Sequence, residues 1–341
     1  MIISTIQVHF APLRALKASE MKNRFGTVMV ACALVFAASL TSAQSDITRI
    51  VVAFPPGGPQ DFVARTMADQ LGKELKQKVV IDNRPGANGA IAAANVMRSE
   101  PDGRTLWITS AGAATINPSL YEKLGYDMQK DFSPVSLVTN NAELLVTSNT
   151  NPAKDLTEYL NRAKASGEPL SIASTGSGSV PHMAVEQLRV SSGINVLHVP
   201  YKGAAPAISD LMGGQVAGLF VDTAGVITLV KARKLRALGI AAPKRTGALP
   251  SVPTLQELGL PNIDTNNWFG IFVHAKTPST KVDELNRAVR NTLETPSIRE
   301  RLASSGSEPA PSTPAELGDL VRRDTQKWGK LIRSAGIRLD Q

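Results

Sequence analysis

Residues 50–65, IVVAFPPGGPQDFVAR, constrain the fold more than any other part of this sequence. A short apolar run typical of a buried strand ends in Pro55-Pro56-Gly57-Gly58, and apolar residues then return at helical spacing. The prolines stop the strand, and the glycines let backbone N–H groups face outward. Because the first N–H groups of a helix lack partners within it and carry partial positive charge, this strand, loop and helix predict an anion-binding loop.

The same arrangement of strand, Gly/Ser loop and helix recurs in residues 170–188, LSIASTGSGSVPHMAVEQL. Our hypothesis is that the two loops, although far apart in sequence, face each other across a cleft. Alternation of strands and helices over 47–110 favours a parallel sheet flanked by helices, and residues 143–240 repeat the α/β pattern. Ligands of open α/β sheets bind at the carboxyl ends of the strands, where both loops would lie.

Composition excludes several classes of function. The net charge is +8, but the basic residues are spread along the chain and aromatic residues make up only 5%, so a nucleic-acid-binding surface is not expected. The one cysteine, Cys32, lies near the N-terminus, so the mature chain would hold no disulfide and no zinc–thiolate site. His182, His198 and His274 have no carboxylates at ligand spacing, and we expect neither a metal nor a cofactor.

The N-terminal segment has the pattern of an export signal. Lys22 and Arg24 precede an apolar run over 25–40, and small residues follow that run. The run of about 16 apolar residues is shorter than the roughly 20 that a membrane-spanning helix needs. We therefore expect residues 1–43 to be a signal peptide, with Met21 as an alternative start, and the mature protein to be periplasmic.

Short motifs follow one another in order along the whole mature chain, each of them weakly specific alone. They are Phe54-Pro55-Pro56-Gly57-Gly58 with Asp61 and Ala64-Arg65, Asn83-Arg84-Pro85-Gly86-Ala87 with Gly89, Pro101-Asp102-Gly103, Ile116-Asn117-Pro118 with Leu120-Tyr121, Lys130-Asp131-Phe132, Gly176-Ser177-Gly178-Ser179 with His182, His198-Val199-Pro200-Tyr201-Lys202-Gly203, Gly213-Gly214-Gln215-Val216, Lys234-Leu235-Arg236-Ala237-Leu238, Leu249-Pro250-Ser251-Val252-Pro253-Thr254 and Trp268. Together they make the chain resemble the substrate-binding proteins of tripartite tricarboxylate transporters, also called Bug receptors.

The resemblance implies an α/β, two-lobed periplasmic binding protein fold, type II-like, with the ligand in the interdomain cleft. It implies a first domain from residues 46–143 plus 270–341 and a second domain from residues 144–269. The implied function is a non-enzymatic extracytoplasmic receptor that captures a small organic carboxylate for a tripartite tricarboxylate-type transporter. The expected partners are that solute and a membrane permease or sensor protein, with no nucleic acid, and the receptor is expected to be a monomer.

Position after predicted strands, loop chemistry and the resemblance together select the candidate ligand-binding residues. Their backbone N–H groups and hydroxyls would grip a carboxylate, although Pro59 has no N–H and removes one donor from the first loop. The candidates are Phe54, Pro55, Gly57, Gly58, Asp61, Ser110, Ala111, Thr175, Ser177, Gly178, Ser179, Tyr201, Gly203, Asp222 and Thr223.

Several candidates also have a structural interpretation. Asp61 either caps its helix or binds an amine or hydroxyl of the solute. Ser179 is a helix N-cap that can share its loop with a ligand, whereas Asp222 and Thr223 either cap a helix or contact a polar substituent. Lys202 could pair with a second carboxylate, but we favour a solvated lysine.

Two other functions compete with the receptor. A serine hydrolase would use Ser179 with His182, but residues three apart at a helix start need not align, and no orienting aspartate follows in a recognisable motif. A structural histidine is therefore favoured. A binding protein for an ABC-type importer of another small solute is the second alternative. Dicarboxylates, tricarboxylates, acidic amino acids and aromatic acids all remain candidate solutes.

Overall fold

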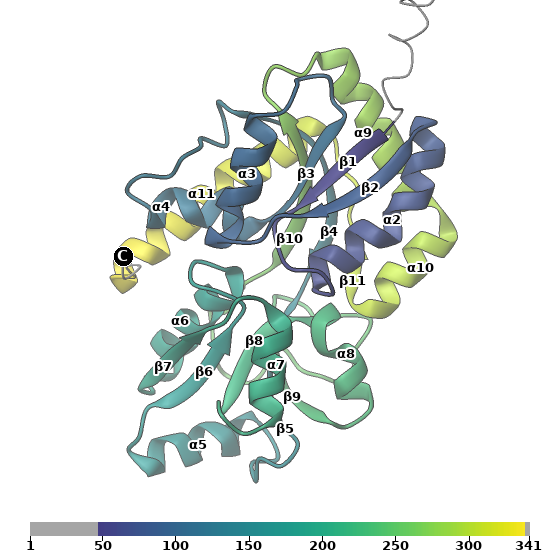
Figure 1. The fold of residues 1–341 in the computed structure, drawn as a ribbon. Helices are drawn as coiled ribbons and strands as arrows, with labels where there is room; N and C mark the ends of the chain where they lie inside the picture. The colour runs from purple at the N-terminus through teal and green to yellow at the C-terminus, as the bar shows by residue number, and fades with distance from the viewer. Residues whose placement is uncertain (1–46, 338–341) are drawn as a thin grey trace, which may run out of the picture. The chain divides into compact units, whose positions relative to one another are not determined.

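The computed structural model describes residues 47–337, so the predicted signal peptide, Met21 and Cys32 lie outside the described residues. The described chain forms one sheet of six strands and one of five, with helices on both faces of each sheet (Figure 1). The α/β fold class is confirmed. Among residues 47–337, none of the helices has the length and apolar character required to span a membrane.

The six-stranded sheet is mixed rather than parallel throughout, unlike the expectation from the strand–helix alternation. Its first three strands are parallel, but β10 pairs antiparallel with both β3 and β4 because it returns from a distant part of the chain. The order is β11-β4-β10-β3-β1-β2. The strands are β1 (Ile47–Val52), β2 (Lys78–Asn83), β3 (Thr105–Ser110), β4 (Phe132–Asn141), β10 (Asn267–His274) and β11 (Ser307–Pro309).

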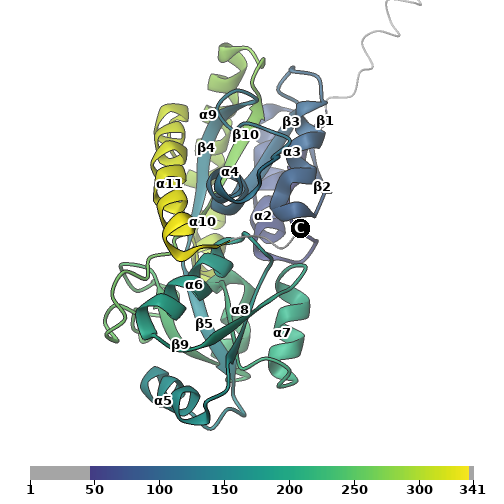
Figure 2. The ribbon, with the colours of Figure 1, turned by 90° about the vertical axis from the view of Figure 1, so that its left-hand side faces the viewer.

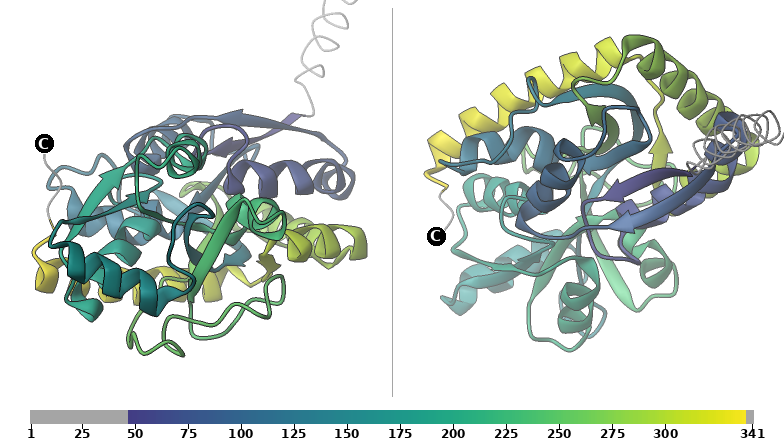
Figure 3. Two further views of the ribbon diagram at one scale, coloured as in Figure 1. Left: turned by 90° about the horizontal axis from the view of Figure 1, so that it is seen from below. Right: turned by 45° about the horizontal axis from the view of Figure 1, so that its top comes forward.

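Alternating side chains of the inner strands build a core on each face of this sheet, as a strand's period of two requires. Val51 and Trp107 point to the face covered by α3, α4 and α11, whereas Ile50 and Ile108 point to the face covered by α2, α9 and α10. Figure 2 shows α11 running beside β4, and the right-hand view of Figure 3 lets α11, in yellow, and α9, in green, be followed. The helices are α2 (Pro59–Leu75), α3 (Ala90–Met97), α4 (Asn117–Leu120), α9 (Ser279–Glu294), α10 (Pro296–Ser305) and α11 (Pro314–Ala335).

The five-stranded sheet repeats the plan, in the order β7-β6-β8-β5-β9. Strands β7, β6 and β8 are parallel, and β5 pairs antiparallel with β8 and β9. Helices α7 and α8 cover one face, and α5 and α6 cover the other. The elements are β5 (Glu143–Ser148), α5 (Leu156–Ser166), β6 (Leu170–Ser174), α6 (Val180–Ser192), β7 (Val196–Pro200), α7 (Ala204–Met212), β8 (Gly218–Asp222), α8 (Thr223–Lys231) and β9 (Leu235–Ala241).

The chain passes between the two sheets at two short segments that lie side by side. Only Ala142 separates the end of β4 from the start of β5. On the return, the Thr265 N–H donates to the Ala241 carbonyl just before β10 begins, and Asn141 Nδ2 donates to the Asn267 carbonyl at 3.0 Å. The predicted domain boundaries stay a prediction, because the chain from residue 47 onward forms one compact unit.

Gly306, at the end of α10, lets the C-terminal part of the chain contact α8. Its φ is +89°, and a Cβ there would lie 2.5 Å from Thr223 Cγ2. We predict that Gly306→Ala lowers the free energy of unfolding by about 2–5 kcal/mol, since left-handed strain costs about 1–2 kcal/mol and overpacking about 1–3 kcal/mol.

Gly167→Ala is the matched control, because Gly167 ends α5 at φ +73° with open space around it. The free energy of unfolding of Gly167→Ala should fall only by the part due to backbone strain. Urea unfolding of both variants measures the difference, and equal losses would contradict a tight contact between Gly306 and Thr223.

Candidate ligand-binding site

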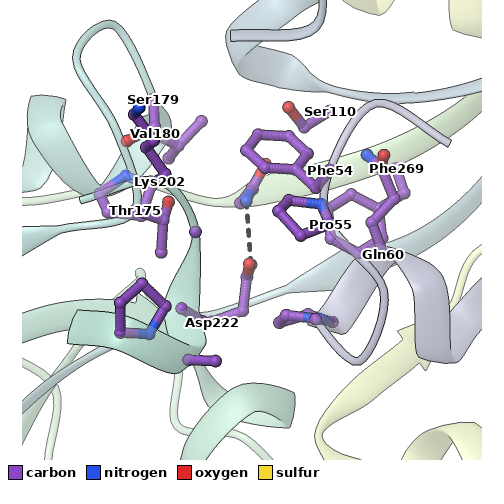
Figure 4. A pocket seen from close by; sticks show the side chains of 18 of the residues that line it. Phe54, Pro55, Gln60, Ser110, Thr175, Ser179, Val180, Lys202, Asp222 and Phe269 are labelled. Atoms are coloured by element: carbon purple, nitrogen blue, oxygen red, sulfur yellow. Dashed lines mark hydrogen bonds between the residues drawn. The ribbon is translucent and has the colours of Figure 1, made fainter. Parts of the chain in front are cut away.

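A pocket of about 560 Å³, including its open mouth, lies where strands of both sheets end. Its walls come from the β1–α2, β6–α6 and β7–α7 loops, the ends of β3 and β8, and the start of β10. Figure 4 shows Phe54, Ser110 and Gln60 facing Thr175, Ser179 and Lys202 across it.

Four helices begin at this pocket. Their N-cap residues Gly58, Ser179, Gly203 and Asp222 start α2, α6, α7 and α8, and all four line it. The first N–H groups of each helix have no acceptor within the helix, and the aligned peptide dipoles add partial positive charge there. The pocket therefore offers an anion backbone donors from helices that follow strands of both sheets, although the first N–H of α8, on Thr223, donates to the Ala142 carbonyl.

Prolines restrict which of those donors exist. Pro59 is the first residue of α2, Pro181 the second of α6 and Pro206 the third of α7, and none of them carries an N–H. Each proline also lines the pocket. The first-turn donors that remain belong to residues such as Gln60 and Val180, so an anion would be held at a few defined positions.

Ser179 is the N-cap of α6, and its hydroxyl is already engaged. Ser179 Oγ donates to the Gly176 carbonyl at 2.7 Å and accepts the His182 N–H at 3.3 Å. The His182 ring in turn accepts the Gly178 N–H at Nδ1, 3.1 Å away. These contacts hold the loop in shape, as expected of a capping serine and a structural histidine.

The His182 ring stacks on His198, with centroids 3.9 Å apart and an interplanar angle of 7°. Burial lowers the pKa of His182 to about 4, and burial together with the His182 charge lowers the pKa of His198 to about 3. Both rings are therefore neutral at neutral pH. His198 Nε2 lies 2.7 Å from Ser174 Oγ at the end of β6, so the pair ties this loop to the sheet.

The candidates chosen from sequence divide into two groups in the structure. Eight of them come together in the lining of the pocket, and seven others among the described residues lie outside that lining. The eight are Phe54, Pro55, Gly58, Ser110, Thr175, Ser179, Gly203 and Asp222. The seven are Gly57, Asp61, Ala111, Ser177, Gly178, Tyr201 and Thr223.

Asp61 turns away from the pocket and fixes the first loop. Its Oδ2 accepts the Gly57 N–H at 2.9 Å and Arg65 Nε at 2.8 Å, and its Oδ1 accepts Asn83 Nδ2 at 2.9 Å. Burial alone would raise the pKa of Asp61, but these hydrogen bonds and the Arg65 charge outweigh it and lower the pKa. Asp61 does not cap its helix, since α2 has no side-chain cap hydrogen bond. It fixes the loop before the helix instead and engages the Gly57 N–H.

The β6–α6 loop is hydrogen-bonded, through Gly178, to the segment that follows β2 of the six-stranded sheet. Asn88 Nδ2 donates to the Gly178 carbonyl at 2.7 Å and also lies 2.8 Å from Asn117 Oδ1. A Cβ on Gly178, whose φ is +77°, would come within 3.0 Å of Leu120 Cδ1. Gly178 therefore links two loops that belong to different sheets, and it lies outside the pocket lining.

The remaining outside candidates have other partners. Ala111 is fully buried in the core beside α3, so the chain continues inward after β3. The Tyr201 hydroxyl donates to Asp210 Oδ2 at 2.7 Å, and the Thr223 hydroxyl donates to the Ala142 carbonyl at 2.8 Å. Ser177 is half-buried in its loop.

The sequence reasoning did not select several residues that line the pocket. Gln60 Oε1 accepts the Ala53 N–H at 2.9 Å, and its buried Nε2 has no hydrogen-bond partner among the described residues. Its place directly after the first loop was the signal that could have found it. Asn267 and Phe269 had no such local signal, because β10 reaches the pocket only by pairing with β3 and β4. The others are Pro56, Pro59, Val180, Pro181, Lys202, Ala204, Ala205 and Pro206.

A buried pair of acids, Asp222 and Glu143, lies beside the pocket, and Asp222 of the pair lines it. Asn267 Nδ2 donates to Asp222 Oδ1 at 2.9 Å (Figure 4), and Glu143 stands opposite Asp222 in the β5–β8 ladder. Burial raises the pKa of Asp222 to about 7, although the hydrogen bond from Asn267 and the nearby Glu143 side chain oppose that rise. Burial, and then the charge of Asp222, raise the pKa of Glu143 well above its usual value.

Comparison with known proteins gives the same picture of the fold. BugT of Bordetella pertussis is 32% identical over 292 residues, which cover 85% of this chain and 90% of BugT. An R. palustris protein solved with adipate has 31% identity and a TM-score of 0.82, covering 85% of this chain and 97% of its own. MatC from Rhodopseudomonas palustris, solved with bound malate, has 33% identity and a TM-score of 0.78, covering 84% and 99%.

BugD, described as a periplasmic binding protein, has 31% identity and a TM-score of 0.81, and covers 86% of this chain and 98% of its own. The two-sheet α/β architecture is therefore that of the periplasmic binding proteins of this type. The model of the family described as "Tripartite tricarboxylate transporter family receptor" matches residues 63–337. Because that match covers most of the chain, the protein belongs to the tripartite tricarboxylate transporter receptor family.

Proposed function

We propose that this protein is an extracytoplasmic receptor that captures a small organic carboxylate in the pocket and delivers it to a tripartite tricarboxylate-type permease. The observation that carries the proposal is the convergence of four helix N-termini on one pocket. Each terminus stabilises an anion by about 0.3–1 kcal/mol, and by up to about 2 kcal/mol in partly buried geometry. Micromolar affinity, about −8 kcal/mol, then needs several charge-assisted hydrogen bonds of about 1.5–3 kcal/mol each.

The ligands of the relatives support a carboxylate as the solute. Adipate and malate, present in two of the solved relatives, both carry two carboxylates. In this chain the helix starts supply donors for one carboxylate, and Lys202 is the one cationic side chain among the described residues that line the pocket. Lys202 is exposed, so we place a second carboxylate of the solute toward the open mouth.

Capture would proceed by closure of two domains, residues 46–143 with 270–341 and residues 144–269. The Asn88–Gly178 hydrogen bond supports this proposal, because it joins loops that belong to different sheets at the edge of the pocket. The closed surface would then meet a membrane permease or a sensor protein. Export through residues 1–43 to the periplasm, and a monomeric receptor, belong to the same proposal.

A receptor without catalytic activity suits the arrangement at Ser179 better than a hydrolase does. A nucleophilic serine must give its proton to a base, but the Ser179 hydroxyl donates to the Gly176 carbonyl. His182 Nδ1 accepts a backbone N–H, and its Nε2 faces Glu186 Oε1 at 3.8 Å. Neither ring nitrogen serves the Ser179 hydroxyl.

The direct test is a thermal-shift screen of the mature protein against carboxylates, followed by calorimetry. The screen includes adipate, malate, citrate, glutamate and benzoate, with adipamide as the uncharged match to adipate. A carboxylate present at 100 times its dissociation constant should stabilise the protein by about 2.7 kcal/mol, since it binds only the folded state. Adipamide should give no shift. Stabilisation by a sugar or an amine, and by none of the carboxylates, would overturn the proposed function.

Thr175→Val should weaken carboxylate binding about tenfold, which corresponds to the loss of one hydrogen bond to a charged group. The valine keeps the shape of the side chain but removes the hydroxyl that lines the pocket. Ser177→Ala is the matched control, since Ser177 is equally half-buried in the same loop and lies outside the lining. Calorimetry should show no loss of affinity for Ser177→Ala, and equal effects in both variants would remove the Thr175 hydroxyl from the site.

A further inference from the structure

Two acids meet at the point where the chain passes from one sheet to the other. Glu143 is the first residue of β5, Asp222 is the last residue of β8, and the two are direct partners in the antiparallel ladder. Glu143 is fully buried and Asp222 is 6% exposed. Like charges placed directly opposite each other across strands destabilise a sheet, and burial makes an uncompensated charge more costly still.

Neither acid has a cationic partner among the described residues. Glu143 and Asp222 form none of the ion pairs within 4.0 Å in residues 47–337, and both oxygens of Glu143 lack a hydrogen-bond partner there. The side chain that compensates Asp222 is the neutral amide of Asn267 on β10. Two buried carboxyl groups with no cation between them avoid this cost by keeping a proton.

The other elements around the pocket do not supply the missing charge. On α2, Asp61 is held by Arg65, and on α6, His182 is neutral because burial lowers its pKa to about 4. On the β7–α7 loop, Lys202 lines the pocket but is exposed to solvent. Thr223 of α8 donates its hydroxyl to the chain crossing at Ala142. The proton on the acid pair is therefore the available compensation.

Asp222 also does not do what an aspartate at a helix start ordinarily does. An N-cap aspartate accepts N–H groups of its own helix, but the Asp222 side chain makes no such hydrogen bond with α8. Its carboxyl group instead points into the middle of the pocket (Figure 4). There it faces the same space as the first turns of α2, α6 and α7.

We propose that Glu143 and Asp222 share one proton in the free protein, that capture of a carboxylate solute beside the pair takes up a second proton, and that the Asp222 hydroxyl then donates a hydrogen bond to that carboxylate. An ionised Asp222 would repel that carboxylate, whereas a protonated one is a donor beside the helix N–H groups. The pair thus selects solutes with a carboxylate at this end of the pocket. This inference rests on the proposed function and assigns the specificity of the same site.

The direction of the pH dependence follows from the raised pKa values. Because the anionic solute holds the proton on Asp222, the dissociation constant should rise with pH, by up to about tenfold per pH unit for one proton, above about pH 7. In the free protein, the folded state holds protons that the unfolded chain has already lost above about pH 4. The stability of the free protein from this pair should therefore fall as the pH rises toward neutrality and beyond.

The test is calorimetry of the mature protein with the carboxylate that binds most tightly in the screen, in two buffers that differ in heat of ionisation. We expect proton uptake that rises toward one proton per solute bound as the pH rises above about 7. Asp222→Asn retains a donor but cannot titrate, so its binding should take up no proton and its dissociation constant should be flat with pH. Glu143→Gln keeps a neutral side chain beside Asp222, so the proton uptake and the rise in dissociation constant above about pH 7 should remain.

Asp61→Asn is the control, because Asp61 is a buried acid beside the pocket that already has Arg65 as its partner. It should leave the number of protons taken up unchanged. Urea unfolding of the free Asp222→Asn protein, compared with wild type across the same pH range, gives a second measure that needs no solute. Its free energy of unfolding should lose the part of the decline with pH that the proton on Asp222 contributes.

The outcomes separate the inference from the function on which it rests. If carboxylates bind with no proton uptake, or with proton release, the inference is overturned and the proposed function stands. The same holds if Asp222→Asn keeps the wild-type pH dependence of binding. If none of the carboxylates binds, both the proposed function and the inference are overturned.

Discussion

The convergence of helix N-termini on one space is the constraint on which the rest of this structure depends. Helices α2, α6, α7 and α8 each follow directly from a strand or its loop, so the order of strands within the two sheets aims all four at the same pocket. The partial positive charge of these helix N-termini stabilises a bound ligand only if the ligand carries negative charge. The prolines in three of the first turns then limit the donors to a few positions, which favours a solute of defined shape.

The acid that lines that space, Asp222, sets the chemistry of the site. Asp222 and Glu143 are held together by the β5–β8 ladder, and Asn267 of β10 donates to Asp222. The segments that hold them are the same ones that carry the chain between the sheets. A change in charge at the pair therefore acts electrostatically on both walls of the pocket. Asp61 shows the contrast, because Arg65 lets it ionise fully while it fixes the first loop.

Local patterns predicted the parts of the site that are local. The strand, glycine loop and helix around Gly58 and the capping Ser179 were read correctly, because each is specified within about ten residues. The placement of Asn267 and Phe269 depends on how β10 pairs with β3 and β4. No short sequence motif specifies that pairing.

Side-chain direction was the other limit on what the sequence could predict. In sequence, Asp61, Tyr201 and Thr223 are neighbours of residues that line the pocket. Their side chains instead form hydrogen bonds with Arg65, Asp210 and the Ala142 carbonyl, respectively. A glutamate at the start of a strand, such as Glu143, ordinarily predicts an exposed edge, and only the fold buries it.

A crystal structure of the mature protein with its tightest-binding carboxylate tests the central claim most directly. The account predicts a carboxylate whose oxygens lie about 2.7–3.2 Å from first-turn N–H groups of α2 and of α6 or α7, with Asp222 in contact with the solute. A solute bound outside this pocket, or held in it by Lys202 alone with the helix starts untouched, would contradict the account.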